Sequence, residues 1–197
     1  MTFRKEIKRS LTISESNILK IELLNDGMKR LYKSRLVNSC YLDNSNFDLL
    51  FLSDEGILPR KKIRIRWYDS NLKFSKETKI SSIEGRFKST EPINFKNLGE
   101  VYKYSEQSID FGLLKPVLKI SYLREYYKYK NLRLTFDSNI KYKTLLGIKS
   151  ISSSDNLNVL EIKSSEETSL DYIERKFALR IIRFSKYSRG IQAVYNI

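Results

Sequence analysis

The stretch KKIRIRWYD, residues 61–69, decides how this sequence folds, because its residues alternate between two chemical types. In an extended strand, one side of this stretch carries only cations, namely Lys62, Arg64 and Arg66. The other side is apolar and carries Ile63, Ile65 and Trp67. The alternation predicts a β-strand whose cationic side faces water, a nucleic acid or the interior of the protein.

Composition indicates a folded protein with an anionic partner. The chain has 197 residues, of which 41% are hydrophobic, and this predicts a single domain over residues 1–197 with its own core. A net charge of +14, from 37 Lys and Arg against 23 Asp and Glu, makes nucleic acid, an anionic membrane and polyphosphate the candidate partners.

Residue types that are absent or rare exclude several kinds of site. The lack of histidine removes the usual general base and the commonest zinc ligand. The single Cys40 excludes an internal disulfide and a cysteine metal cluster, which favours a reducing compartment. No apolar run is long enough to span a membrane, and the start MTFRKEIKRS lacks the apolar core of a signal peptide. We therefore expect a soluble, cytoplasmic protein.

Apolar spacing predicts two helices around a set of strands. Residues 14–35 have a helical stripe and a cap at Ser14 or Ser16, although Gly27 weakens the pattern. The stripe consists of Ile18, Ile21, Leu24, Met28 and Leu31. The second helix, 167–184, has a cap at Thr168 or Ser169 and a stripe of Leu170, Ile173, Phe177 and Ile181. The predicted strands are RLVNSCYLD, KKIRIRWYD, LKFSKETKI, GRFKST, KPVLKISYLREYYK, LRLTFDSNIKYK, LLGIKSI and NVLEIKS.

The charged sides of these strands allow two interpretations. For one strand alone, an apolar side on a core and a solvated charged side is the ordinary arrangement. Several strands together, however, place cations on one side with isolated acids between them, as in LRLTFD, VLEIK and KETK. A barrel of about eight strands has room for one slender ligand, and cations packed inside it are stable only around a polyanion.

The order of short motifs resembles one family along nearly the whole chain. The motifs are RKEIK (4–8), SCYLD (39–43), EGILPRKKIRIRWYD (55–69), FSKETK (74–79), KPVLKISYLREYY (115–127), LRLTFDSNIKY (132–142), VLEIK (159–163) and SKYSRGI (185–191). This series is similar to the VTC domain, the catalytic domain of the vacuolar transporter chaperone complex and its bacterial standalone relatives. That family belongs to the CYTH-like triphosphate tunnel metalloenzymes. The resemblance implies an α+β fold, a closed antiparallel β-barrel of about eight strands with flanking helices.

The resemblance also implies roles for particular residues. Phosphates would be clamped by Arg64, Arg66, Arg124 and Arg133. Further point charges would come from Lys8, Lys79, Lys88 and Lys186. Glu161 would bind Mn²⁺ or Mg²⁺, and Glu6 and Glu77 are additional candidate metal ligands. Arginine suits the clamp because its planar fork binds two phosphate oxygens and stays charged at any working pH. Two arginines on one strand lie about 7 Å apart, so neighbouring strands would supply the contacts between them.

The function implied by the resemblance is that of a polyphosphate polymerase, with ATP and polyphosphate or triphosphate as ligands. A tunnel triphosphatase uses the same clamp, and a non-catalytic binding module for polyphosphate or nucleic acid is the alternative outside catalysis. We expect no nucleic-acid partner, because no helix shows a basic recognition side and no RNA-recognition aromatic motif occurs. Since the chain lacks the membrane segments of the fungal assemblies, any membrane association would run through a separate membrane-protein partner.

Overall fold

The chain divides into two compact units, each built from three separate segments. The computed structural model describes residues 4–147, 150–165, 169–177 and 184–195. Unit 1 consists of Met1–Arg35, Tyr122–Ile140 and Asp155–Phe184. Unit 2 consists of Leu36–Ser121, Lys141–Ser154 and Ser185–Ile197.

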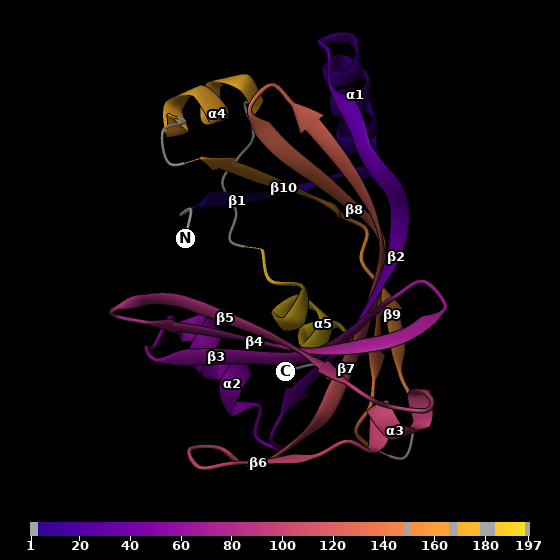
Figure 1. Cartoon of the computed structure of the whole chain (residues 1–197), viewed down its shortest axis with the longest axis vertical. Helices are drawn as coiled ribbons and strands as arrows, with labels where there is room; N and C mark the ends of the chain where they lie inside the picture. Colours follow the sequence, from indigo (N-terminus) through magenta and orange to yellow (C-terminus); the bar gives the residue numbers. More distant parts are fainter. Residues whose placement is uncertain (1–3, 148–149, 166–168, 178–183, 196–197) are drawn as a thin grey trace. The chain divides into compact units, whose positions relative to one another are not determined.

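Strands outnumber helices in the described part of the chain (Figure 1). The strands are β1 (Arg4–Leu11), β2 (Lys29–Asp43), β3 (Arg60–Tyr68), β4 (Asn71–Ser82), β5 (Gly85–Ile93), β6 (Glu106–Ser108), β7 (Gly112–Tyr129), β8 (Leu132–Thr144), β9 (Ser152–Ser154) and β10 (Asn158–Ser165). The helices are α1 (Ile13–Asn25), α2 (Asp48–Glu55), α3 (Leu98–Lys103), α4 (Leu170–Phe177) and α5 (Lys186–Tyr195).

The strands form a large antiparallel sheet in the order β1-β10-β8-β7-β2-β3-β4-β5, with β6 beside β7 and β9 beside β8. The long strands β2, β7 and β8 each contribute residues to both units. The expected α+β class, with a large antiparallel sheet and flanking helices, is confirmed. The strand order does not show closure of this sheet into a barrel.

The core of unit 1 lies on the apolar side of its strands. Leu134 and Phe136 of β8 and Ile162 of β10 are almost fully buried in one cluster. Leu23 of α1 and Ile173 of α4 belong to the same cluster, so both helices pack against this side of the strands. The charged residues of β8 and β10 alternate with these apolar residues and therefore lie on the opposite side.

The first helix is shorter than the sequence predicts. It ends at Asn25 because Gly27 takes a left-handed conformation (φ 89°), and the Met28 N–H then donates to the Leu23 carbonyl at 2.8 Å. Residues 29–35, predicted as helix, are the start of β2. The cap is Thr12, not Ser14 or Ser16: Thr12 and Glu15 form a capping box.

The predicted apolar stripe of this helix is also largely wrong. Ile18, Ile21 and Leu24 are exposed, whereas Ser16 and Leu23 face the core. Helical spacing predicts an apolar side, but it does not determine which side of the helix contacts the core, because that contact is set by the strands that the helix covers.

The second predicted helix is confirmed as α4 over Leu170–Phe177, with Ile173 and Phe177 buried. Thr168, Ile181 and the Leu170 side chain lie outside the described residues. Helices α2, α3 and α5 are not predicted by the apolar spacing. The segment LLGIKSI, predicted as a strand, is irregular in its described residues, and the strand near it is β9.

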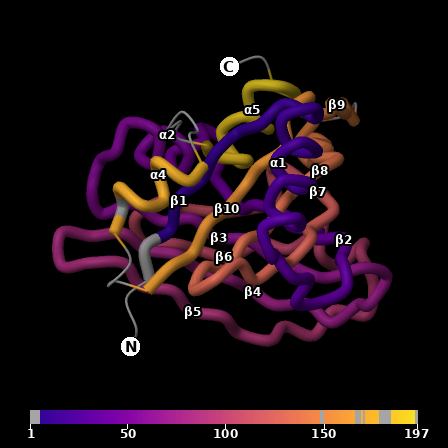
Figure 2. The backbone as a smooth tube through the Cα atoms, turned by 90° about the horizontal axis from the view of Figure 1, so that it is seen from above, coloured from indigo at the N-terminus to yellow at the C-terminus, as the bar shows by residue number. Residues whose placement is uncertain are grey.

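Unit 2 is built on the adjacent strands β3, β4 and β5, which run side by side in Figure 2. Ile63, Ile65 and Trp67 are buried on the apolar side of β3, as the alternation predicts. They share a cluster with Leu49 of α2. Asp43 at the end of β2 accepts hydrogen bonds from the Leu49 and Leu50 N–H groups, both at 3.0 Å, and so fixes the start of α2.

Candidate functional site

A cationic face in unit 2 is assembled by strand register. The pairings place Arg64 opposite Glu77, Lys62 opposite Lys79, and Lys79 opposite Lys88. On the other edge of β3, Tyr41 and Ser39 of β2 lie opposite Arg64 and Arg66. Because facing residues of neighbouring strands project to the same side, these side chains share one face, which we call the unit 2 face. Four of the predicted phosphate-binding residues, Arg64, Arg66, Lys79 and Lys88, lie on it.

One buried carboxylate holds three of these cations. Arg64 donates to Glu77 from Nε at 2.8 Å and from Nη2 at 2.5 Å. Arg66 Nη1 lies 3.6 Å and Lys88 Nζ 3.3 Å from the same carboxylate, whose residue is 7% exposed. Burial alone would raise the pKa of Glu77, but Arg64, Arg66 and Lys88 outweigh it and lower this pKa to about 2. Glu77 is therefore ionised and acts as the counter-ion of the face.

Tyr41 adds a polar group to the same face. Arg64 Nη1 donates to the Tyr41 hydroxyl at 2.9 Å, and Arg66 Nε donates to Ser39 Oγ at 3.1 Å. Burial would raise the pKa of Tyr41, but Arg64 and Arg66 overcome it and lower this pKa to about 8. The tyrosine ring stacks on Tyr187 of α5, with the ring centres 4.7 Å apart and the planes 5° apart.

The start of α5 lies against this face. Lys62 Nζ donates to Ser185 Oγ at 3.3 Å, and the Tyr187 hydroxyl donates to Asp43 at 2.7 Å. These two contacts, together with the Tyr41 stack, position the residue between them, Lys186. Lys186, the fifth predicted phosphate-binding residue of unit 2, therefore begins a helix whose neighbouring residues contact the face, and apolar spacing did not predict this helix.

Unit 1 carries a second charged face, the unit 1 face, with cations and acids in a checkered pattern. On β1 and β10, Lys8 lies opposite Glu161 and Glu6 lies opposite Lys163. On the other edge of β10, Glu161 lies opposite Thr135 of β8. Arg133 lies opposite Lys163 in the same register. The predicted residues Lys8, Glu6, Glu161 and Arg133 are therefore brought together on adjacent strands.

Glu161 is a buried carboxylate surrounded by cations. Its oxygens lie 3.0 Å from Lys163 Nζ, 3.6 Å from Arg124 Nη2 and 3.9 Å from Lys8 Nζ. Burial would raise the pKa of Glu161, but the three cations hold this pKa well below its usual range. The carboxylate is thus charged, as a metal ligand has to be.

The two arginines of unit 1 have different environments. Arg124 binds Asp137 through two hydrogen bonds, at 2.6 and 2.7 Å, and Asp137 is fully buried. Burial would lower the pKa of Arg124, but Asp137 raises it well above its ordinary value. Arg133 is exposed, and its guanidinium lies 6.0 Å from the centre of the Tyr126 ring. Arg124 is therefore fixed in position, whereas Arg133 presents its charge to solvent.

The residues around Glu161 fit a hard divalent cation that arrives with phosphate. Thr135 Oγ1 is buried without a hydrogen-bond partner, and Thr135 is the cross-strand neighbour of Glu161. A carboxylate and a hydroxyl are oxygen donors of the kind that Mg²⁺ and Mn²⁺ prefer. In the described part of the chain, no three His, Cys, Asp or Glu side chains gather as a metal group. Phosphate oxygens and water would thus have to complete the coordination.

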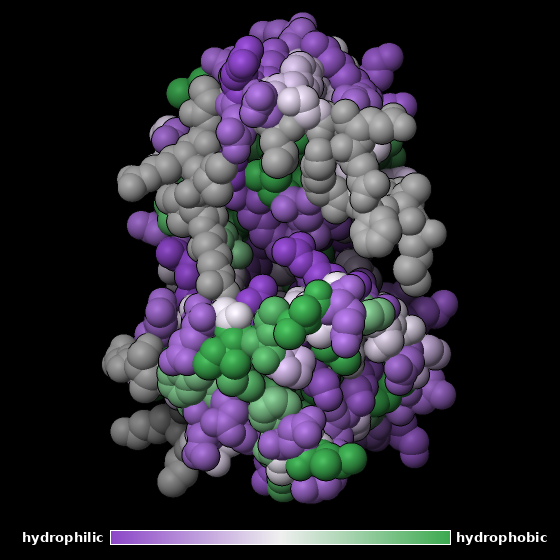
Figure 3. Space-filling model, turned by 90° about the vertical axis from the view of Figure 1, so that its left-hand side faces the viewer, coloured by the Kyte–Doolittle hydropathy of each residue, from purple (hydrophilic) through white to green (hydrophobic). Residues whose placement is uncertain are grey.

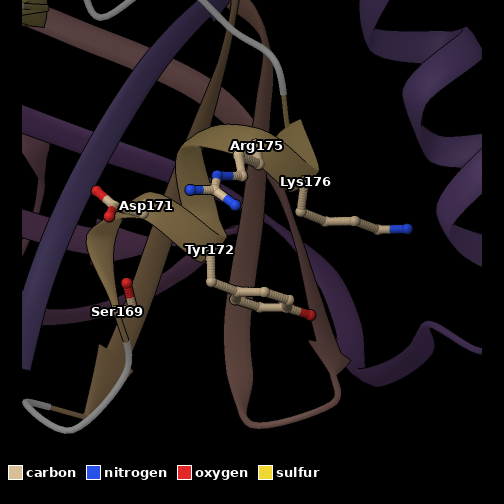
Figure 4. A pocket seen from close by; sticks show the side chains of 5 residues that line it. All are labelled: Ser169, Asp171, Tyr172, Arg175 and Lys176. Atoms are coloured by element: carbon tan, nitrogen blue, oxygen red, sulfur yellow. The ribbon is translucent and has the colours of Figure 1, made fainter.

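A pocket elsewhere in unit 1 contains none of the predicted phosphate-binding residues. It has a volume of about 500 Å³ and is lined by α4 side chains and by Ser169, which precedes that helix (Figure 4). Lys176, on its rim, pairs with Asp26 at 2.5 Å. We assign this pocket no part in the phosphate chemistry.

Some hydrophobic side chains lie on the surface of the protein. Figure 3 shows a mostly hydrophilic surface, with hydrophobic side chains gathered in the lower half of that view. Phe51 of α2 and the following Ile57 and Leu58 are among the exposed apolar residues. Within the described ranges, no helix is both long and apolar enough to cross a membrane.

Several residues of these faces were not among the predicted site residues. They are Ser39, Tyr41, Lys62, Thr135, Asp137, Lys163 and Tyr187. The alternation within SCYLD, KKIRIRWYD, LRLTFD and VLEIK could have identified those on strands, since each lies two residues from another residue of its face. Tyr187 depends on the packing of α5 and has no such signal.

Comparisons with known proteins identify the family and the fold of the chain. The VTC domain family matches residues 1–88 and 71–195. Among solved structures, a candidate adenylate cyclase from Bacillus halodurans has a TM-score of 0.59 at 14% identity, covering 92% of this chain and 95% of its own. No curated protein matches the chain.

Two other solved structures have the same fold. A candidate adenylyl cyclase from Hippeastrum, reported with a dominant triphosphatase activity, has a TM-score of 0.56 at 18% identity, covering 94% of both chains. A protein from Pyrococcus horikoshii has a TM-score of 0.56 at 16% identity, covering 96% of this chain and 99% of its own. Identities this low establish likeness of fold alone. The family match spans nearly all of the sequence, so the chain belongs to the VTC domain family, and its fold is similar to that of the CYTH-like tunnel proteins.

Proposed function

We propose that the chain, acting as a single VTC-like domain, is a polyphosphate polymerase that transfers the γ-phosphoryl group of ATP to the end of a polyphosphate chain. In this reaction the bond between the γ-phosphorus and the oxygen that ADP retains is broken. A bond from the same phosphorus to a terminal polyphosphate oxygen is formed, and ADP leaves. The reaction needs positioning and charge neutralisation more than covalent participation by the protein, so the lack of histidine is no obstacle.

The observation that carries the proposal is the gathering of Arg64, Arg66 and Lys88 around Glu77. Three cations held by one carboxylate leave an excess of positive charge on the unit 2 face. Phosphate oxygens satisfy that excess, and the guanidinium forks orient them. Because Glu77 and Ser39 fix the forks before any ligand binds, little side-chain entropy is lost on binding.

The unit 1 face carries a second set of groups suited to phosphate and metal. Asp137 fixes the Arg124 guanidinium, and Arg133 and Lys8 contribute further charge to phosphate oxygens. Glu161, with Thr135 beside it, would hold Mn²⁺ or Mg²⁺. When bound, the metal neutralises charge that develops on the transferring phosphoryl group.

The product of ATP consumption tests this proposal. We expect the purified chain with ATP and Mn²⁺ to form a ladder of polyphosphate on a gel. Arg66→Ala should abolish the ladder, whereas Arg175→Ala, which removes an exposed charge from α4, should retain it.

Other products of the same incubation would assign a different activity. Free phosphate without polymer would identify a triphosphatase, the activity named for the Hippeastrum protein. ATP binding without turnover would identify a non-catalytic binding module.

A further inference from the structure

A hollow of about 390 Å³ in unit 2 is lined almost entirely by lysine and serine. Strands β7, β8 and β9 all contribute to it. The lysines are Lys119, Lys141 and Lys143, and the serines are Ser121, Ser152, Ser153 and Ser154. We call this feature the lysine–serine hollow. It shares no residue with the unit 2 face.

Strand register places the three lysines and three of the serines, Ser121, Ser152 and Ser154, in two adjacent rows. Lys143 pairs with Ser152, and Lys141 pairs with Ser154. The Leu145 N–H donates to the Val117 carbonyl at 3.0 Å, and antiparallel pairing continued from this bond places Lys143 beside Lys119 and Lys141 beside Ser121. Each row therefore crosses three strands, and the two rows are about 7 Å apart, the rise of two residues.

The hollow lies on the opposite side of the strands from the unit 2 face. Lys119 Nζ lies 5.6 Å from the centre of the Trp67 ring. Trp67 belongs to the apolar side of β3, and its neighbour Arg66 points to the other side. A ligand in the hollow is therefore separated from Arg64 and Arg66 by the sheet itself.

The described residues provide no acidic counter-ion for the lysines of the hollow. No carboxylate within the described residues lies within 4.0 Å of Lys119, Lys141 or Lys143. This differs from the two faces, where Glu77 and Glu161 each lie within 4.0 Å of three cations. Three neighbouring ammonium groups without such a carboxylate attract an anion.

The chemistry of the lining indicates which anion. Ammonium and hydroxyl groups both donate hydrogen bonds to phosphate oxygens. A nucleic acid would also use exposed rings for base stacking, but Tyr142 is 2% exposed and Trp67 is 3% exposed. We propose that the lysine–serine hollow is a second binding site, which holds inorganic polyphosphate on the side of the sheet opposite the unit 2 face. The choice of polyphosphate rests on the proposed function, whereas the site itself rests on the unpaired lysines.

The experiment measures binding of fluorescent long-chain polyphosphate by anisotropy, with EDTA and without ATP. All proteins carry Arg66→Ala, so that the unit 2 face contributes little. We expect Lys141→Ala/Lys143→Ala to weaken binding at least about tenfold and to reduce the slope of log affinity against log salt by roughly 1 to 2, as loss of two phosphate contacts predicts. The control Lys73→Ala/Lys96→Ala removes the same charge from exposed positions of unit 2 and should bind like its parent.

Each other outcome overturns the proposal. Equal losses in the two double variants would mean diffuse attraction by net charge, and no loss in either would mean that the hollow binds nothing. A single-stranded oligonucleotide with the same number of phosphates is measured in parallel. If only oligonucleotide binding depended on Lys141 and Lys143, the hollow would be a nucleic-acid surface. Unchanged melting temperatures exclude misfolding. Failure of the unsubstituted protein, with Arg66 present, to make polymer from ATP would remove the proposed function without altering this binding result.

Discussion

Replacing Glu77 by Gln should destabilise the empty protein and strengthen its binding of triphosphate. A pKa of about 2, against an ordinary value near 4.5, corresponds to roughly 3 kcal/mol of stabilisation from the charged form. The Arg64 and Lys88 side chains are 26% and 55% exposed, so solvent screening reduces this to about 2 kcal/mol. For a chain of this length, the melting temperature should fall by roughly 4 to 8 °C at pH 7.

The pH dependence of this loss has a definite sign. Because the folded-state pKa is depressed, the stabilisation by Glu77 is present above about pH 4.5 and is lost as the pH falls towards 2. The difference in melting temperature between the parent and Glu77→Gln should therefore shrink over that range. Calorimetric scans from pH 7 to pH 3 measure it.

Glu77→Gln should bind triphosphate more tightly, although its melting temperature is lower. Loss of a negative charge beside three cations should tighten metal-free triphosphate binding about tenfold, which corresponds to about 1.4 kcal/mol. Glu106→Gln is the matched control, because Glu106 pairs with Lys76 on the opposite side of β4. It should not tighten triphosphate binding. Weaker triphosphate binding by Glu77→Gln at an unchanged melting temperature would refute the counter-ion role.

Three further outcomes follow from the same groups. Triphosphate at one hundred times its dissociation constant should add about 2.7 kcal/mol to the free energy of unfolding and raise the melting temperature by roughly 5 to 10 °C. Monophosphate at the same concentration should not, and equal shifts from both ligands would indicate only nonspecific screening of surface charge. Ionisation of Tyr41, which has a pKa of about 8, adds negative charge beside Arg64. Between pH 7 and pH 9, triphosphate affinity should therefore fall about tenfold more in the parent than in Tyr41→Phe. Calorimetric titration measures both affinities. Glu161→Gln should keep or tighten metal-free triphosphate binding yet lose turnover with Mn²⁺; full activity would move the metal assignment to Glu6 or Glu77.

The strands and most of their charged side chains could be predicted from the sequence. Alternation in a strand is a local signal, so Arg64 and Arg66 were placed on one side of β3 without knowledge of the neighbouring strands. Ordered motifs then linked different strands, and Lys79 of β4 does lie opposite Lys62 of β3, while Lys88 of β5 lies opposite Lys79.

The helices and the ion pairs were less predictable, because they depend on packing. Gly27 ends α1 by its left-handed conformation, and the side of α1 that packs is chosen by the strands below it. The alternation in LRLTFD predicts only that Asp137 is a charged side chain of the strand. In the structure Asp137 is fully buried, because Arg124, thirteen residues earlier, binds both of its oxygens. Such partners depend on register, which alternation within one strand does not contain.

The most direct test of the central claim is calorimetric titration of triphosphate into the parent, Arg66→Ala and Arg175→Ala, all in EDTA. Arg66 is 6% exposed and is held by Ser39 and Glu77 on the unit 2 face, whereas Arg175 is exposed on α4. If the unit 2 face binds the phosphate chain, Arg66→Ala should weaken binding by at least about tenfold and Arg175→Ala should bind like the parent. Equal affinities for all three proteins would contradict a phosphate site on this face.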